Sequence, residues 1–147
     1  MIRQSGPAAY QIAPGAITAT GATTAFVLPW TDWDAFVINL TAAAVTGTSP
    51  TGDFYLQTMG PDGNWYDVYH FTQVTTTVAT TAPLWALLSI TTARAIAAVG
   101  SKTISANALG VPPLTNQFRI AYTIGGTTPS ITPIFNILGI EANRDGF

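Results

Sequence analysis

The chain has 147 residues, of which 48% are hydrophobic and only 8% are charged, and it contains no cysteine. This length fits one domain that buries a sizeable core without metals or disulfides. The lack of cysteine excludes disulfides, thiolate metal sites and a thiol nucleophile. The formal net charge of -2, with Lys102 as the only lysine, removes the electrostatic basis for nonspecific nucleic-acid binding. We therefore expect no nucleic-acid partner, and a surface that is in large part not left facing water.

The N-terminal residues 1–15 have prolines at positions 7 and 14, which forbid a regular helix and interrupt any central strand. Tyr10 and Ile12 offer side chains that can be buried. We predict an extended N-terminal arm over residues 1–15, followed by a β domain over residues 16–147. The arm is either a frayed terminus or a segment that packs on a neighbouring subunit. It lacks the apolar stretch of a signal peptide.

Two predicted strand regions follow the arm. Residues 16–28 are expected to form one or two strands around Gly21, and residues 35–44 a central strand in which apolar positions alternate. Residues 46–52 are rich in threonine, glycine, serine and proline, so we expect a loop there.

The next stretch is typical of a β-hairpin. Residues 53–59 alternate with a period of two, residues 60–64 carry the proline, aspartate and glycine of a tight turn, and residues 65–71 resume the alternation. One face of the first strand is predicted to hold Phe54, Leu56 and Thr58. One face of the second is predicted to hold Trp65, Asp67, Tyr69 and Phe71, and the other Tyr66, Val68 and His70.

Residues 72–81 are threonine-rich and predict a strand followed by a loop. Residues 84–99 form the most apolar run, but it is shorter than the roughly 20 residues of a membrane helix and carries Arg94, so we expect no membrane partner. A helix is possible there, but two short strands on either side of Thr91 and Thr92 are favoured. Residues 101–113 alternate again before two prolines.

Residues 118–124 alternate as a strand, residues 125–130 contain two glycines and a proline, and residues 131–140 alternate again, so a second hairpin is predicted. Many short strands without a convincing long helix indicate an all-β fold. We predict a single-domain antiparallel β-sandwich or jelly roll with an extended N-terminal arm.

No residue pattern indicates catalysis. His70 is the only histidine and lies on a predicted strand, which favours a structural role. Asp32 and Asp34 flank Trp33 and resemble a glycosidase pair only in spacing. Asp62, Asn64 and Asp67 lack the ordered acidic series of a calcium loop. We therefore expect a protein that is not an enzyme, with no catalytic residue, no cofactor and no metal site.

The four tryptophans fall into two groups according to the sequence around them. Trp65 and Trp85 lie in apolar runs and are predicted to pack in the core. Trp30 and Trp33 lie in a loop-like segment. Together with Tyr10 and Ile12 of the arm, they are the predicted partner-contact residues.

Two stretches carry a resemblance to a known group of proteins. The first combines Phe54-Tyr55-Leu56-Gln57-Thr58 with Pro61-Asp62-Gly63-Asn64-Trp65-Tyr66-Asp67-Val68, and the second runs from Phe118-Arg119-Ile120 to Gly125-Gly126-Thr127 and on to Thr132. A hydrophobic strand, an Asp-Gly turn before Trp-Tyr-Asp and a late strand that ends in Gly-Gly-Thr resemble small β-sandwich virion proteins of tailed bacteriophages. The likeness is strongest to capsid cement or decoration proteins.

The resemblance implies a homotrimer on the capsid exterior that bridges subunits of the major capsid protein, with a terminal segment reaching neighbouring subunits. We therefore predict a non-enzymatic virion protein that stabilises the shell. The alternatives are a structural protein of tail, neck or fibre, and a carbohydrate-binding surface module that uses Trp30 and Trp33.

Overall fold

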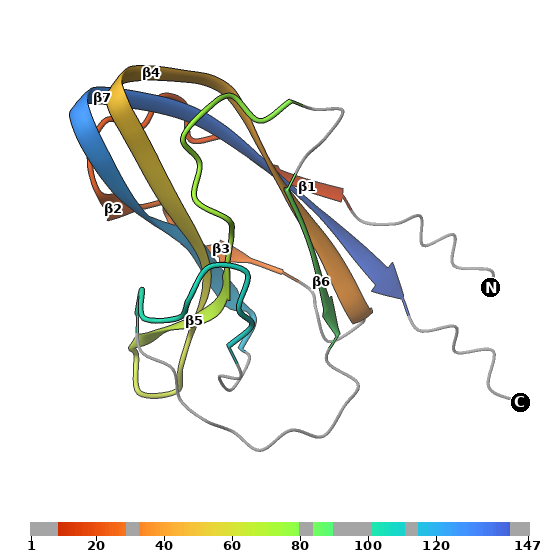
Figure 1. The fold of residues 1–147 in the computed structure, drawn as a ribbon. Helices are drawn as coiled ribbons and strands as arrows, with labels where there is room; N and C mark the ends of the chain where they lie inside the picture. The colour runs from red at the N-terminus through yellow and green to blue at the C-terminus, as the bar shows by residue number, and fades with distance from the viewer. Residues whose placement is uncertain (1–8, 29–32, 80–83, 90–100, 111–114, 142–147) are drawn as a thin grey trace, which may run out of the picture.

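The computed structural model describes residues 9–28, 33–79, 84–89, 101–110 and 115–141 (Figure 1). These residues form seven strands and no helix. The strands are β1 (Ala9–Ile12), β2 (Gly21–Ala22), β3 (Phe26–Val27), β4 (Trp33–Met59), β5 (Trp65–His70), β6 (Leu84–Ser89) and β7 (Gln117–Glu141). All pairings between them are antiparallel, so the all-β prediction is confirmed.

Two long strands form the frame of the sheet. β4 and β7 pair along nearly their whole lengths, from Trp33 opposite Glu141 to Thr58 opposite Phe118. The shorter strands attach to this pair. β1, β2 and β3 bond to β7, and β5 and β6 bond to β4, which gives one seven-stranded sheet.

The paired strands bend together in the middle, at the upper left of Figure 1, where two similar motifs face each other. Gly47-Thr48-Ser49-Pro50 in β4 lies opposite Gly126-Thr127-Thr128-Pro129 in β7, and Thr48 pairs with Thr127. The backbone angles match. Each glycine has a positive φ, 115° in β4 and 108° in β7, and each residue before proline has another, 49° and 47°. The register also shifts around both motifs, so the bend is a pair of matched irregularities within the ladder.

The bend encloses the hydrophobic core between the two halves of the sheet. Phe36, from the first half of β4, meets Phe118, from the first half of β7, edge to face with ring centroids 6.1 Å apart. Phe54 meets Phe135 in the same manner at 5.6 Å. Each pair joins residues on opposite sides of the bend. The largest fully buried side chains are Phe36, Phe54, Phe71, Phe118, Phe135, Leu28, Ile38, Leu40, Leu56, Ile120, Ile131 and Ile137. The finer choice between a β-sandwich and a jelly roll stays a prediction.

Two sequence predictions at the bend are wrong. Residues 46–52 are not a loop, and residues 125–130 are not the turn of a second hairpin, because both segments belong to continuous strands. Glycine and proline normally end a strand. Here each motif finds its complement on the neighbouring strand, so pairing resumes on the other side.

The β4–β5 hairpin is confirmed, but the predicted faces of β5 are wrong. Leu56 pairs with Tyr69, and the next pair joins Gln57 to Asp67, so Val68 is an extra residue in β5. This bulge changes the side on which the following residues point. Asp67 and His70 therefore share one face of the sheet. Regular alternation would place them on opposite faces.

Part of the predicted arm belongs to the sheet. Ala9–Ile12 is extended and pairs with β7, with Tyr10 opposite Ile137 and Ile12 opposite Phe135. The side chains of Tyr10 and Ile12 are half-buried and pack against the core of their own chain. Residues 1–8 lie outside the described residues.

The remaining predictions are met in part. Strands near residues 16–28 are confirmed as β2 and β3, which are short. The strand predicted at residues 72–81 is reduced to two bridges, Val74 to Gly52 and Val78 to Ala42. β6 confirms the first of the two strands expected in residues 84–99, and residues 90–99 lie outside the described residues.

Candidate functional site

A row of three polar side chains crosses three neighbouring strands on the outer face of the sheet. Gln57 of β4 pairs with Arg119 of β7 on one side and Asp67 of β5 on the other. Its amide nitrogen Nε2 donates to Asp67 Oδ1 at 2.8 Å, and its oxygen Oε1 accepts from Arg119 Nε at 2.8 Å. Gln57 and Asp67 are both 0% exposed. The row is a buried polar network in which the glutamine links an acid to a base.

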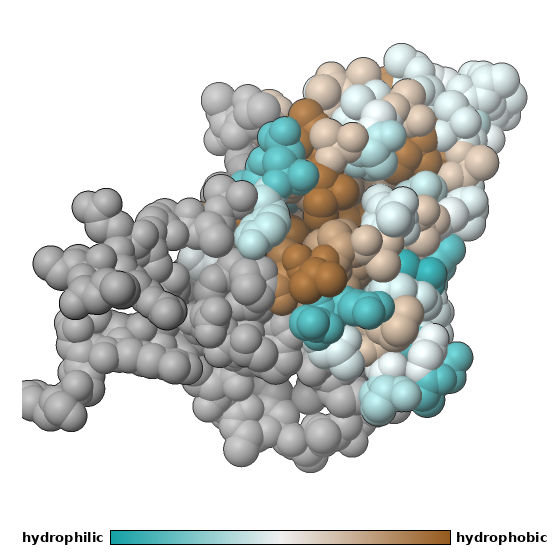
Figure 2. All heavy atoms as spheres, turned by 180° about the vertical axis from the view of Figure 1, so that it is seen from behind, coloured by the Kyte–Doolittle hydropathy of each residue, from teal (hydrophilic) through white to brown (hydrophobic). Residues whose placement is uncertain are grey.

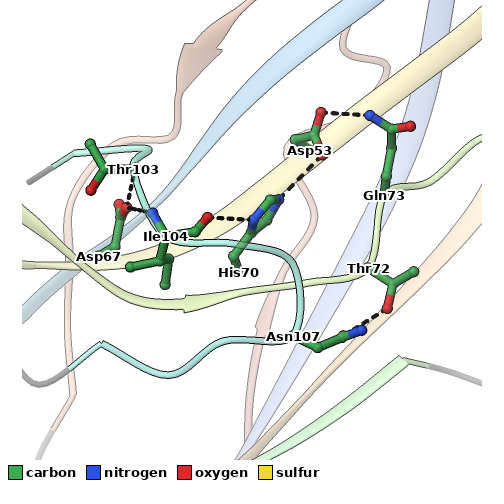
Figure 3. A network of polar contacts seen from close by, with 8 residues as sticks. All are labelled: Asp53, Asp67, His70, Thr72, Gln73, Thr103, Ile104 and Asn107. Atoms are coloured by element: carbon green, nitrogen blue, oxygen red, sulfur yellow. Dashed lines mark hydrogen bonds and ion pairs between the residues drawn. The ribbon is translucent and has the colours of Figure 1, made fainter. Parts of the chain in front are cut away.

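The carboxylate of Asp67 also binds the backbone of residues 102–104 (Figure 3). It accepts the backbone N–H groups of Lys102 at 2.7 Å, Thr103 at 2.7 Å and Ile104 at 3.3 Å. Hydrogen bonds of this kind to a charged group are stronger than neutral ones. Asp67 therefore anchors residues 102–104 across the hairpin, which explains how a charged side chain near the edge of the sheet becomes fully buried.

His70 lies in a second part of the same network. Its ring stacks on Tyr55, its partner across the strands, with centroids 4.0 Å apart. Nδ1 lies 2.9 Å from the carbonyl oxygen of Ile104 and Nε2 lies 3.2 Å from Asp53 Oδ1. Both partners are acceptors, so whichever ring nitrogen carries a proton has an oxygen to donate it to. The Asp53 carboxylate also accepts from Gln73 Nε2 at 2.9 Å.

Tyr55 is affected by this environment. Burial removes its phenol from water, and the carboxylates of Asp53 and Asp67 lie near it. Both effects disfavour the phenolate, so the pKa of Tyr55 is raised above its ordinary value. The phenol thus stays neutral at neutral pH.

A pocket opens at the turn end of the hairpin, beside the polar row. Its volume is about 410 Å³, and it is lined by Gly63, Asn64, Trp65, Tyr66, Ser101 and Arg119. We call it the Trp65 pocket. The guanidinium carbon of Arg119 lies 4.4 Å from the centre of the Trp65 ring, in cation–π contact. Partial burial lowers the pKa of Arg119, which still leaves a guanidinium charged at neutral pH.

The turn below the pocket is held by Asp62. Its carboxylate accepts from the backbone N–H of Asn64 at 3.1 Å, from Asn64 Nδ2 at 2.8 Å and from the Tyr66 hydroxyl. The Tyr66 hydrogen bond, followed by those of Asn64, lowers the pKa of Asp62, and the same contact raises the pKa of Tyr66. Asp67 is committed to residues 102–104 instead, so Asp62, Asn64 and Asp67 do not converge. No group of three or more acidic or histidine side chains suited to a metal occurs within the described ranges.

The structure places the predicted contact residues in different settings. Tyr10 and Ile12 pack on the core of their own chain. Trp33 begins β4, where its backbone pairs with Glu141, and its side chain lies outside what is described. Trp30 and Asp32 lie outside the described residues altogether, as do the side chains of Asp34 and Trp85. Trp65, predicted for the core, instead lines the pocket and is half-buried.

The row of Arg119, Gln57 and Asp67 was not predicted from the sequence. A glutamine in the middle of an apolar strand is a signal, since a buried amide needs partners. Its partners come from β5 and β7, 10 and 62 residues away in the sequence, so strand alternation alone does not identify them.

No described segment forms a helix long and apolar enough to cross a membrane. In comparisons with known proteins, no protein-family model matches the chain, and neither a curated protein nor a solved structure matches it.

Proposed function

We propose that this chain is a non-enzymatic structural protein of a bacteriophage virion. In this role it sits on the capsid exterior as a cement or decoration protein and stabilises the shell by bridging subunits of the major capsid protein. The proposal includes self-association into a homotrimer. It rests on the resemblance of the hairpin and the β7 sequence, and on one property of the described surface.

That property is the engagement of every charged side chain that the structure describes. Asp53, Asp67 and Arg119 belong to the polar network, and Asp62 bonds to Asn64 and Tyr66. Lys102 Nζ donates to the carbonyl oxygen of Tyr122 at 3.2 Å. Each charge thus has a partner within the chain, and the rest of the described surface is uncharged.

Such a surface favours burial in an assembly. Contact cores between proteins are depleted of charged residues, because each charge removed from water needs a new partner. Here each described charged side chain already makes at least one such contact inside the chain. Exposed hydroxyl and apolar groups remain, including Val27 at 58% exposure and Leu138 at 40%. Figure 2 shows apolar residues gathered in a band on one face, with hydrophilic residues beside them.

The sheet also suits a bridging role mechanically. The bent β4–β7 pair spans the molecule, and its bend carries exposed hydroxyl side chains from both motifs, such as Thr48 and Thr127. A rigid body that contacts several neighbours at once gains avidity even when each contact is weak. A trimer multiplies such contacts by symmetry.

The test uses virions of the phage that encodes the chain. We expect the purified protein to be a trimer by light scattering coupled to size exclusion. We expect it in stoichiometric amounts in virions. Shells that lack it should break at lower temperature, and added protein should restore their resistance. Its absence from virions, or binding without any gain in heat resistance, would refute the proposal.

A structural role in the tail, neck or fibre is the alternative, and the same uncharged surface supports it. Labelling of intact virions with a gold-conjugated antibody separates the two roles. Label on the shell supports the cement role, whereas label confined to the tail or neck supports the alternative.

A further inference from the structure

We propose that the Trp65 pocket binds a sugar acid, whose carboxylate is held by the guanidinium group of Arg119. This inference concerns a ligand site and does not depend on the virion role. Three observations on the pocket carry it: an arginine whose terminal donors are unused by the described residues, the absence of a counter-ion for it among those residues, and a matched pair of neutral polar groups.

The first observation is the state of Arg119. Its Nε donates to Gln57 and its plane lies over Trp65, so the guanidinium is fixed on two sides. Within the described part of the chain, its terminal nitrogens Nη1 and Nη2 have no hydrogen-bond partner. A guanidinium presents these N–H groups as a planar fork that matches the two oxygens of a carboxylate. Prior fixing of the fork reduces the entropy lost on binding.

The second observation concerns charge. Among the described residues no carboxylate forms an ion pair with Arg119, and the ion pair that is found joins His70 to Asp53. Asp67 is reached only through Gln57, and its oxygens are occupied by backbone N–H groups. A partly buried cation without a counter-ion is unfavourable, and a ligand carboxylate supplies the missing charge.

The third observation is the pair of neutral groups beside the fork. Ser101 Oγ accepts from Gln57 Nε2 at 2.8 Å, which leaves its hydroxyl proton to donate. Asn64 uses Nδ2 on Asp62, which leaves its carbonyl oxygen Oδ1 to accept. One donor and one acceptor next to an aromatic ring suit the hydroxyls and the C–H face of a sugar. A volume of about 410 Å³ also suits a compact ligand of this kind.

The experiment is a titration of the ¹⁵N-labelled protein, followed by amide and indole NMR signals. The probes are sodium glucuronate, its methyl ester, which has the same ring without the charge, and acetate, which has the charge without the ring. We expect saturable shifts at Trp65, Ser101 and Asn64 with glucuronate, and at least tenfold weaker binding of both other probes. No saturable shift with glucuronate overturns the proposal. Equal binding of the ester overturns the carboxylate contact, and equal binding of acetate overturns the sugar.

Two variants separate the fork from its charge. Arg119→Lys keeps the charge but cannot form the two parallel hydrogen bonds of a guanidinium to a carboxylate. Glucuronate should therefore bind roughly tenfold more weakly. Lys102→Gln removes one positive charge nearby and leaves the fork, so binding should change less than twofold. An equal loss in both variants would mean that the sugar acid responds only to net charge, and would overturn the assignment to Arg119.

Discussion

Oε1 of Gln57 accepts a hydrogen bond from Nε of Arg119 at 2.8 Å, while the amide nitrogen of the same side chain donates to Asp67. A fully buried amide thus has an acid on one side and a base on the other. Gln57 makes one hydrogen bond to each of the two charged side chains and keeps them apart. Among the described residues, the outer N–H groups of Arg119 remain unused.

The first prediction follows from this pair. Gln57→Leu keeps a similar volume but removes the side-chain hydrogen bond that Gln57 makes with each of Asp67 and Arg119. We expect the free energy of unfolding to fall by about 2–4 kcal/mol, since unsatisfied buried groups cost about 1–3 kcal/mol each and more when charged. Urea denaturation at pH 7 measures it.

Gln11→Leu is the matched control, because Gln11 also makes a side-chain hydrogen bond, to Asn136, but is exposed. Its effect should stay within about 0.5 kcal/mol, as for most surface changes. Equal effects of the two changes would contradict the central place of Gln57.

The second prediction concerns Asp67. Asp67→Asn replaces one carboxylate oxygen by an NH₂ group that faces backbone N–H donors of residues 102–104. We expect a loss of about 2–4 kcal/mol and faster amide hydrogen exchange at Lys102 and Thr103. Asp62→Asn makes the same chemical change in an exposed turn and should leave exchange at those two amides unaltered. Unchanged protection in Asp67→Asn would contradict the anchoring role.

The third prediction tests the bend. A Cβ at Gly126 would lie 2.6 Å from the carbonyl oxygen of Ser49, and φ there is 108°. Gly126→Ala therefore meets both backbone strain and a clash with backbone, and should cost more than about 2 kcal/mol.

Gly63→Ala separates the two effects, because Gly63 also has a positive φ, 80°, but a Cβ there meets nothing within 4 Å. It should cost only about 1 kcal/mol. Thermal unfolding compares the two variants. A similar loss in both would mean that the close approach at the bend contributes little.

The fourth prediction concerns pH. The hydrogen bond from Tyr66 lowers the pKa of Asp62 and raises that of Tyr66. The lowered carboxyl pKa stabilises the folded turn above the unfolded value near 3.8, and this contribution is lost as pH falls through the folded pKa. The raised phenol pKa stabilises it below about 10, and this contribution is lost as pH rises through the folded value.

Tyr66→Phe should therefore raise the pKa of Asp62 toward its ordinary value. A ¹³C NMR titration of the aspartate carboxyl carbons measures this shift. Asp53 is the internal control, since its partners His70 and Gln73 are untouched. An Asp62 titration that is the same in both proteins would show that the Tyr66 hydroxyl does not hold the carboxylate in solution.

Local patterns were sufficient to predict the all-β class and the first hairpin. Phe54, Leu56 and Thr58 are fully buried on one side of β4, as their alternation indicates. The turn at residues 60–64 forms where proline, aspartate and glycine place it. These features depend on neighbours in the sequence, so a single sequence contains the information.

The bend and the polar row depend on partners far away in the sequence. Gly47 fits the continuous strand because it lies against the backbone of Thr127, Thr128 and Pro129, where a Cβ would be only 2.8 Å from the carbonyl oxygen of Thr128. His70 shares a face with Asp67 and Gln57 only because Val68 is an extra residue. Neither fact follows from local propensity, which identifies a glycine–proline segment as a turn and a regular strand as alternating. The pocket at Trp65 was missed for the same reason, since Arg119 comes from β7.

The matched bend also sets the order in which the chain assembles. Neither motif completes its bulge alone, so β4 and β7 must meet in one register before the two halves of the sheet can close on the phenylalanines. The segments that must meet first are separated by most of the chain, with Trp33 opposite Glu141 at one end. Long-range pairing of this kind slows folding to milliseconds or seconds. On a ribosome, the edge of residues 33–59 that pairs with β7 therefore stays unpaired until β7 emerges, even after β5 has paired with the other edge. The core, which includes Phe118 and Phe135 of β7, can form only then.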